Sequence, residues 1–284
     1  MYEKRSGIKF ILIPTIVILL IAVGVAAFLL HRNGFFGNGE SVPVDAFNTP
    51  VPEATATPEP TPEPTPTPEP EPLTMRERYD RIVWIDAGNG GGDVGPIGVL
   101  DGVNQYGKDI TLAIALKVYD LFDASEAGVR AFLSRSADVT LPVAERPDIW
   151  NDYADLVVSI HLNGFGGENP QYVGGFLVNY DQNKEVNTGR FNVTDRRFAQ
   201  IMQTHLRREI VPLGARDRGV SGYNNLRINT HSTMPSVLVN AGFVTNPAEL
   251  ALLITEDYQM SIAQAIYGAV VQAFGYPRNV VSGE

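Results

Sequence analysis

A run of proline, threonine and glutamate at residues 51–72 most constrains what this chain can fold into. The segment reads VPEATATPEPTPEPTPTPEPEP. Proline fixes φ and removes a backbone donor, and the segment offers almost no apolar side chain to bury. It therefore predicts an extended polyproline-II spacer without a core. Any globular fold must lie in the residues that follow.

An almost unbroken apolar run, residues 8–30, precedes this spacer. A helix of about 20 apolar residues crosses the hydrocarbon core of a bilayer, so the run predicts a transmembrane anchor. Basic residues are more frequent before the run than after it, which predicts a cytoplasmic N-terminus. The alternative is a cleaved signal peptide, but its apolar region usually spans about 7–15 residues and ends at a small-residue site that is not evident here.

The sequence thus predicts a single-pass membrane protein whose C-terminal domain is extracytoplasmic. It has no cysteine, which excludes disulfides and thiolate metal sites. The net charge is −10, and the folded segment is itself acidic, which argues against nucleic acid as a partner. The predicted segments are a cytoplasmic tail (1–7), the anchor (8–30), a linker rich in Pro, Thr and Glu (31–72) and the folded domain (73–284).

Short β-rich runs alternate with amphipathic helices after residue 73, which is typical of an α/β domain. We expect one domain with a twisted, mostly parallel or mixed sheet of about six strands flanked by helices. Pro147 suits the second helix only if that helix starts late or kinks. The expected strands are 81–86, 129–134, 155–161, 174–180 and 236–240, and the expected helices are 109–124, 141–153, 194–210 and 256–274.

Polar residues follow several of the expected strands. Asp86 and Asn89 follow the first strand, His161 and Asn163 the third, and Asn240 the last. Ligands of open α/β sheets bind outside the carboxyl ends of the strands. We therefore expect these residues to converge on one site, although they are far apart in the sequence.

The glycine-rich stretch WIDAGNGGGDVG allows more than one kind of loop. Gly90, Gly92 and Gly95 satisfy G-x-G-x-x-G after a strand, but dinucleotide binding needs a helix to open there. The residues from Pro96 onward predict further loop instead, with the first helix only near Asp109. No Gly-Lys-Ser/Thr follows, which excludes a P-loop. A metal-binding loop remains.

Five segments together resemble a known family. IDAGNGGGDVGPIG is similar to the usual opening Ile-Asp-Pro-Gly-His-Gly-Gly-x-Asp-x-Gly of the N-acetylmuramoyl-L-alanine amidase family 3, the zinc-dependent bacterial cell-wall amidases. The resemblance continues in order through GKDITLAIAL, LSRSADVTLPVAER, DLVVSIHLNG and MPSVLVNAGFVTNPAE, and it spans nearly all of residues 80–275. It implies the amidase fold and a place in the bacterial cell envelope.

The resemblance also implies a zinc site, from which this sequence departs. Active members hold zinc with histidine, glutamate and histidine, and a second glutamate is the general base. These positions fall on Asn89, Gly107, His161 and Asn240 respectively. Catalytic zinc usually has three protein ligands, and an asparagine cannot accept the proton that a carboxylate accepts. We therefore expect no catalytic residue, no metal ligand set and no cofactor.

The losses are consistent with one another. Without zinc, two buried glutamates would be unpaired charges costing several kcal/mol each, and both positions hold neutral residues. Other side chains near the site could in principle replace the missing ligands, but at least two would have to reach His161. The candidates are Asp86, Asp93, Asp109 and His231, of which Asp86 and Asp109 are expected to orient loops through hydrogen bonds.

Asn89, His161, Asn163 and Asn240 remain possible ligand-binding residues. In the alternative, His161 is a hydrogen-bonded core histidine, and Asn89 and Asn240 are plain turn and strand-cap residues. His205 is expected on a solvated helix surface.

Three functions remain open. The domain is a catalytically inactive binding module for peptidoglycan, an interaction protein that docks a cell-envelope partner, or an active amidase with an unusual metal set. The neutral residues at the zinc positions favour an inactive member of the family, a pseudoenzyme, tethered to the membrane by its own anchor.

Overall fold

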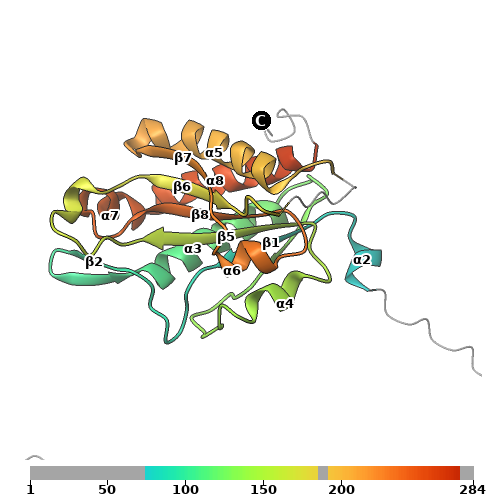
Figure 1. Cartoon of the computed structure of the whole chain (residues 1–284), viewed down its shortest axis with the longest axis horizontal. Coiled ribbons are helices and arrows are strands. Elements are labelled where there is room, and N and C mark those ends of the chain that lie inside the picture. Colours follow the sequence, from blue (N-terminus) through green and yellow to red (C-terminus); the bar gives the residue numbers. More distant parts are fainter. Residues whose placement is uncertain (1–73, 185–190, 276–284) are drawn as a thin grey trace, which may run out of the picture. The chain divides into compact units, whose positions relative to one another are not determined.

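The structure is a computed structural model, and it describes residues 74–184 and 191–275 (Figure 1). The predicted tail, anchor and linker lie outside the described residues and stay predictions. Within the described part, no helix has both the length and the apolar character needed to cross a membrane.

The described chain alternates strands and helices, as expected of an α/β domain. The strands are β1 (Ile82–Ala87), β2 (Ile97–Leu100), β3 (Val103–Tyr106), β4 (Arg130–Leu133), β5 (Leu156–Asn163), β6 (Phe176–Tyr180), β7 (Asp217–Gly222) and β8 (Ser236–Phe243). The helices are α2 (Met75–Arg78), α3 (Gly107–Asp123), α4 (Arg146–Trp150), α5 (Asp195–Ile210), α6 (Arg227–His231), α7 (Pro247–Leu253) and α8 (Glu256–Ala273), with 3-10 turns η1 (Pro170–Tyr172) and η2 (Val211–Leu213).

Six strands form one mixed sheet in the order β4-β1-β5-β8-β6-β7, which confirms the predicted sheet. The first four strands in this order run parallel. β6 is antiparallel to β8, and β7 is parallel to β6. The carboxyl ends of β1, β5 and β8 therefore lie at the same edge of the sheet as the amino ends of β6 and β7.

Three long helices, α3, α5 and α8, cover one face of the sheet and form the main core with it. Every second residue of a strand points to this face, for example Val158 and Ile160 of β5 and Val237 and Val239 of β8, all fully buried. Each such side chain contributes roughly 1.5–3 kcal/mol by leaving water. Thr194 caps α5 by accepting a hydrogen bond from the Arg197 N–H.

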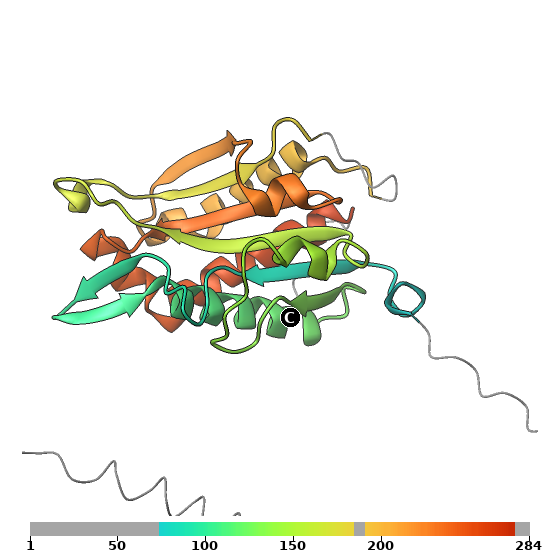
Figure 2. The ribbon, with the colours of Figure 1, turned by 60° about the horizontal axis from the view of Figure 1, so that its bottom comes forward.

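The opposite face is covered only in part. Figure 2 shows the short helices α4 and α6 in front of the sheet, with the long helices behind it. A small cluster around Trp84, Trp150 and Val157 fills the space under these two helices. Further along the strands the same face carries polar, partly exposed side chains such as His161 and Asn240. This uncovered part of the sheet is where a ligand can approach.

Several elements differ from the sequence-based expectation. The stretch after Pro96, predicted as loop, forms the hairpin β2–β3, whose Asp101-Gly102 turn has φ values of 49° and 77°. The second helix begins only at Arg146 and has proline within its first turn, so it starts late. The strand β7 and the helices α6 and α7 were not predicted, because each is short and carries little periodic apolar signal.

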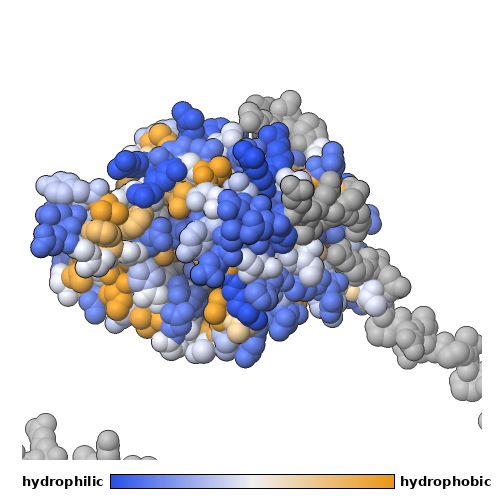
Figure 3. Space-filling view, viewed as in Figure 1, coloured by the Kyte–Doolittle hydropathy of each residue, from blue (hydrophilic) through white to orange (hydrophobic). Residues whose placement is uncertain are grey.

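The β2–β3 hairpin carries exposed apolar side chains at the end of the molecule where the site edge lies. Ile97, Val99 and Val103 are 42%, 56% and 58% exposed. Figure 3 shows apolar residues gathered at the end of the molecule where Figure 1 labels β2 and α7. This end is therefore less polar than the rest of the face shown.

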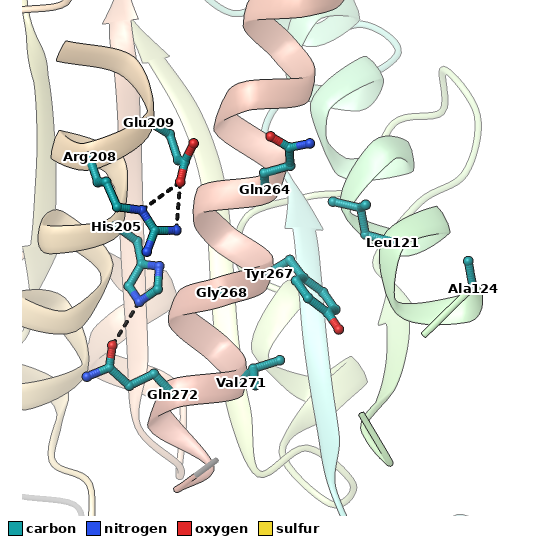
Figure 4. A pocket seen from close by; sticks show the side chains of 10 residues that line it. All are labelled: Leu121, Ala124, His205, Arg208, Glu209, Gln264, Tyr267, Gly268, Val271 and Gln272. Carbon is teal, nitrogen blue, oxygen red and sulfur yellow. Dashed lines mark hydrogen bonds and ion pairs between the residues drawn. The ribbon is translucent and has the colours of Figure 1, made fainter. Parts of the chain in front are cut away.

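A cavity of about 410 Å³ lies on the helical side of the sheet (Figure 4). Its walls come from α3, α5 and α8, and none of its residues belongs to the strand ends described above. His205 of α5 points into it and its Nε2 lies 2.8 Å from Gln272 Oε1. His205 is only 3% exposed, so the expectation of a solvated histidine was wrong. Its ring packs against Gly268 of α8, where any Cβ would lie 2.7 Å from its Nδ1.

A largely buried lysine fixes the connection between α6 and β8. Lys184 Nζ donates to the carbonyl oxygens of Asn229, Ser232 and Met234 at 2.8–3.0 Å. It also lies 3.0 Å from Asp195 Oδ1, and burial lowers the pKa of Lys184 while raising that of Asp195. The ammonium group thus joins the start of α5 to the segment that leads into the central strand β8.

Replacing Lys184 by alanine should destabilise the fold strongly. Lys184→Ala leaves the buried Asp195 carboxylate without its cationic partner and removes the ammonium donor from several carbonyl oxygens, so the free energy of unfolding should fall by about 3–5 kcal/mol. Lys117→Ala is the matched control, because its partner Glu256 is exposed and such a pair contributes at most about 1 kcal/mol. Urea denaturation of the full-length protein measures both. Equal losses in the two variants would contradict this role of Lys184.

Candidate functional site

The predicted polar residues converge at one edge of the sheet. His161 of β5 and Asn240 of β8 are register partners on the face that α4 and α6 leave uncovered. The loop after β1 joins them, because the Gly88 N–H donates to the Ile160 carbonyl oxygen at 2.9 Å. The prediction that these residues lie close together is confirmed for the first loop, β5 and β8.

His161 packs flat against the backbone of the glycine loop. A Cβ on Gly88 would lie 2.6–2.7 Å from three atoms of its imidazole ring, so only glycine leaves room for the ring. Its Nε2 is buried and has no hydrogen-bond partner within the described chain. Burial lowers the pKa of His161, so its imidazole is neutral at neutral pH. The alternative was a core histidine held by hydrogen bonds. The structure does not show this for Nε2, which has no partner among the described residues.

Asn89 is held in a left-handed conformation, with φ of 60°. Its Nδ2 donates to Asp93 Oδ2 at 2.9 Å, and its Oδ1 is buried without a donor from the described residues. Asparagine tolerates this conformation better than most residues. The Asn89 side chain therefore stabilises the turn through Nδ2, while its Oδ1 is an acceptor to which no described residue donates.

Two arginines hold the loop through its backbone carbonyl oxygens. Arg146 Nη1 forms a buried ion pair with Asp86 Oδ1 at 2.6 Å, and its Nη2 donates to the Asn89 carbonyl oxygen at 2.7 Å. Arg135 donates to the carbonyl oxygens of Ala87 and Gly88 at 3.0 Å. The expected role of Asp86 as a residue that orients the loop is confirmed, since its other oxygen accepts from Ser159 Oγ at 2.5 Å.

A lysine and an aspartate fasten the tip of the glycine loop. Asp138 Oδ1 accepts from the Gly91 N–H at 2.7 Å, and Lys108 Nζ bridges Asp138 Oδ2 and the Gly91 carbonyl oxygen. The bond from Lys108, followed by that from Gly91, lowers the pKa of Asp138. These residues, like Arg135 and Arg146, were not predicted, because their partners are 17 to 60 residues away and no local pattern marks them.

Gly107, the second zinc-ligand position, opens α3 with no room for a side chain. A Cβ there would lie 2.8 Å from Pro96 Cδ and 3.2 Å from Pro96 Cγ. The Gly107 N–H donates to the Pro96 carbonyl oxygen at 2.9 Å, which keeps the two residues together. A proline ring therefore fills the space next to the backbone where a ligand side chain would begin.

Asn240, the general-base position, takes part in a chain of amides. Its Nδ2 donates to Asn179 Oδ1 of β6 at 3.0 Å, and Asn229 Nδ2 donates to the Asn179 carbonyl oxygen at 3.2 Å. Asn163, at the end of β5, accepts from the Val244 N–H through its carbonyl oxygen at 2.9 Å. The side chain of Asn240 is thus fixed as a hydrogen-bond donor toward β6, with its Oδ1 as the remaining acceptor.

These residues do not fit a catalytic zinc ion. Of the three ligand positions, only His161 offers a good zinc ligand, Asn89 binds Asp93, and Gly107 has no side chain. The described residues contain no group of three or more His, Asp or Glu placed to hold a metal ion.

The possible substitute ligands are also engaged elsewhere or exposed. Asp86 pairs with Arg146, His231 lies 3.1 Å from Arg227 Nη1 and 2.8 Å from Thr230 Oγ1, and Asp109 is exposed in the first turn of α3. The donor chemistry of this site is that of neutral amides and one neutral imidazole.

The chain is similar to known cell-wall amidases over the described domain. Residues 83–272 match the family model of N-acetylmuramoyl-L-alanine amidase. The Bacillus subtilis protein YqiI, described as uncharacterized, is 35% identical over 191 residues, which cover 67% of this chain and 83% of that protein.

Solved structures show the same likeness. The N-acetylmuramoyl-L-alanine amidase from Clostridium difficile 630 is 30% identical with a TM-score of 0.59, covering 68% of this chain and 95% of its own. The CwlD amidase from Clostridioides difficile, solved in complex with the GerS lipoprotein, is 28% identical with a TM-score of 0.55, covering 68% and 98%.

A side chain at residue 107 should overlap the ring of Pro96 and destabilise the fold. Gly107→Ala should cost about 1–3 kcal/mol of unfolding free energy because Cβ overlaps the proline ring, although alanine gains up to about 1 kcal/mol in helix propensity. The double variant with Pro96→Ala should lose less than the sum of the single losses. Gly92→Ala is the control, since its Cβ would meet only Thr140 Oγ1, at 3.8 Å. Strictly additive losses of unfolding free energy would show that the added Cβ does not overlap the proline ring.

The lowered pKa of His161 should make stability depend on pH. The unfolded chain binds a proton near the ordinary histidine pKa of about 6.5, while the folded chain resists it, so stability should fall as the pH drops below about 6.5 and level off below the folded pKa. His161→Gln should remove this part of the slope, and His231→Gln, at an exposed histidine, should keep it. Melting temperatures between about pH 7.5 and 5.5 measure the slopes. An unchanged slope in His161→Gln would contradict the assignment.

Proposed function

The chain belongs to the N-acetylmuramoyl-L-alanine amidase family, and we propose that it binds peptidoglycan through the family's site without cleaving it. The observation that carries this proposal is the donor set of the site: Asn89, Gly107 and Asn240 stand at positions that active members need for metal binding and proton transfer. The family match supports peptidoglycan as the ligand class.

The chemistry of these residues supports a catalytically inactive site. Hydrolysis of an amide needs an activated water, and water that no metal ion activates has a pKa far above neutral pH and stays a poor nucleophile. Asn240 cannot take its proton, because an amide is not a base at neutral pH and its Nδ2 donates to Asn179. Proline packed against Gly107 also supports a settled site without a ligand side chain at that position.

The same residues support binding. The described residues leave two buried polar atoms at the site without a partner, Asn89 Oδ1 and His161 Nε2. Buried polar atoms are usually hydrogen-bonded, so these two call for a ligand or ordered water. Asn240 Oδ1 adds an acceptor. Neutral amides both donate and accept, which suits the peptide and N-acetyl groups of peptidoglycan.

We also propose that the domain works at the outer surface of a bacterial membrane. Support comes from the sequence alone: an apolar run long enough to span the bilayer, and a proline-rich acidic linker that holds the domain away from it. An exported anchor with such a spacer delivers a domain into the cell wall.

A second candidate is docking to a cell-envelope protein. One relative, the CwlD amidase, is described in complex with a lipoprotein, so domains of this fold do assemble with protein partners. The exposed apolar residues of the β2–β3 hairpin offer such a partner a surface beside the site. The remaining alternative, an active amidase with a non-standard metal site, requires ligands that the described residues do not bring to His161.

The proposal predicts wall binding without turnover. The full-length protein, purified in detergent and dialysed against trace zinc, should hold less than about a tenth of an equivalent of zinc, because one good ligand does not retain the metal. It should sediment with purified peptidoglycan and release no stem peptide. Asn240→Ala should weaken this binding roughly three- to tenfold, and Gln264→Ala, on the helical side, should not change it.

Each contrary result has a distinct meaning. Stoichiometric zinc with peptide release that a chelator stops would establish the active amidase instead. Failure to bind the wall, together with stable capture of a purified envelope lipoprotein through the hairpin, would establish the docking function.

A further inference from the structure

The polar row at the site continues beyond Asn240 toward the edge strand β7. Asn240 of β8 is the register partner of Leu177 of β6. On the other side of β6, Phe176 pairs with Asp217 and Val178 with Val220, and a bulge lies between them. The residues beside Leu177 on β7 are therefore Arg218 and Gly219.

Arg218 lies on the same face of the sheet as His161 and Asn240. Side chains of neighbouring register partners point to the same face, and successive residues alternate. Phe176 and Val178 belong to the main core under the long helices, so Leu177 points to the other face. Asp217 accepts a hydrogen bond from Gln203 of α5, on the helical side. Its neighbour Arg218 therefore points to the open face with Leu177.

The guanidinium group of Arg218 is held in a fixed orientation, but most of its N–H donors have no acceptor among the described residues. Its Nη1 donates to the Gly174 carbonyl oxygen at 3.1 Å, and its Cζ lies 5.4 Å from the centre of the Phe243 ring. These two contacts fix the plane of the group at the end of β8. Arginine has five N–H donors, so most of them remain for another partner.

No carboxylate of the described residues uses these donors. Arg218 forms no ion pair there, and Glu249, an acidic group that feels its charge, has other hydrogen-bond donors. The two carboxylate oxygens of Glu249 accept from the N–H groups of Gly175 and Phe243. An exposed, oriented and unpaired guanidinium on an acidic domain is a site for an oxyanion.

We propose that Arg218 binds a carboxylate of an extended acidic peptide that runs from His161 and Asn240 toward the end of β8, where the Arg218 guanidinium group lies beside Phe243. The proposal rests on the binding function above and names its ligand more closely. Phe243 is three residues beyond Asn240 on β8, which is roughly 10 Å along the strand at roughly 3.3 Å per residue. An extended peptide covers this distance in about three residues. The ligand thus presents neutral amide groups near Asn240 and a negatively charged carboxylate about three residues further along its chain.

The arrangement separates two kinds of recognition. Asn89, His161 and Asn240 are neutral and contact amides, whereas Arg218 selects for charge. Leu177, between Asn240 and Arg218, is partly exposed and gives the middle of the peptide an apolar contact. A peptidoglycan stem whose carboxylates are amidated presents the same amides without the charge, so the site discriminates between acidic and amidated stems.

Binding of matched muropeptides to the full-length protein tests this inference. The probes are a muramoyl peptide with free carboxylates and the same peptide with the carboxylates amidated. The wild type should bind the acidic probe about tenfold more tightly than the amidated one, the size of one charge-assisted contact. Arg218→Gln should bind both probes with the weaker affinity, and Arg218→Lys should be intermediate. Arg207→Gln, an exposed arginine on the helical side, should behave as the wild type.

The outcomes separate this inference from the proposed function. If the wild type binds the wall and both probes equally, or if Arg218→Gln keeps the preference, peptidoglycan binding stands and the role of Arg218 is wrong. If nothing binds, both fail. If a glycerol-phosphate polymer binds in an Arg218-dependent way and the acidic muropeptide does not, the oxyanion is a phosphate and the peptide assignment is wrong. Melting curves of each variant check that the fold is kept.

Discussion

The buried ion pair between Arg146 and Asp86 is the interaction on which the site depends. It lies under the loop that follows β1, and the same guanidinium group reaches the carbonyl oxygens of Ala87 and Asn89. Losing one partner of such a pair typically costs about 3–5 kcal/mol, because the other charge stays buried. Arg135 holds the Ala87 and Gly88 carbonyl oxygens, so the two arginines together fix the backbone of this loop.

These protein contacts explain how a fold whose relatives bind zinc can carry neutral residues at the metal-ligand and general-base positions. The positions that hold zinc ligands and the general base in active relatives carry no unpaired charge here, and the space at each is filled. Pro96 fills the space at Gly107, Asn240 joins the amide chain of β6, and Asn89 turns the loop while binding Asp93. Each replacement has a partner in the fold.

The sequence predicted the sheet, the long helices and the meeting of His161 with Asn240, because these follow from long periodic segments and from the rule that strand ends share an edge. It did not predict Arg135, Arg146, Lys108 or Asp138, whose roles depend on contacts between distant segments. The β2–β3 hairpin was missed because glycine and proline around it favoured loop. His205 was misplaced because a polar residue on an amphipathic helix usually faces water, whereas here Gly268 makes space for its ring.

The packing of Pro96 against Gly107 also bears on the history that this domain can have. A glutamate returning at residue 107 meets the proline ring, a histidine returning at residue 89 must give up the turn that asparagine supports, and a carboxylate returning at residue 240 would face the Asn179 side chain with no metal ion to neutralise it. Each step back is harmful unless the others are already present. Descent from a metal-dependent ancestor, once these partners were in place, would therefore run in one direction, because the changes that restore the metal site would have to arrive together.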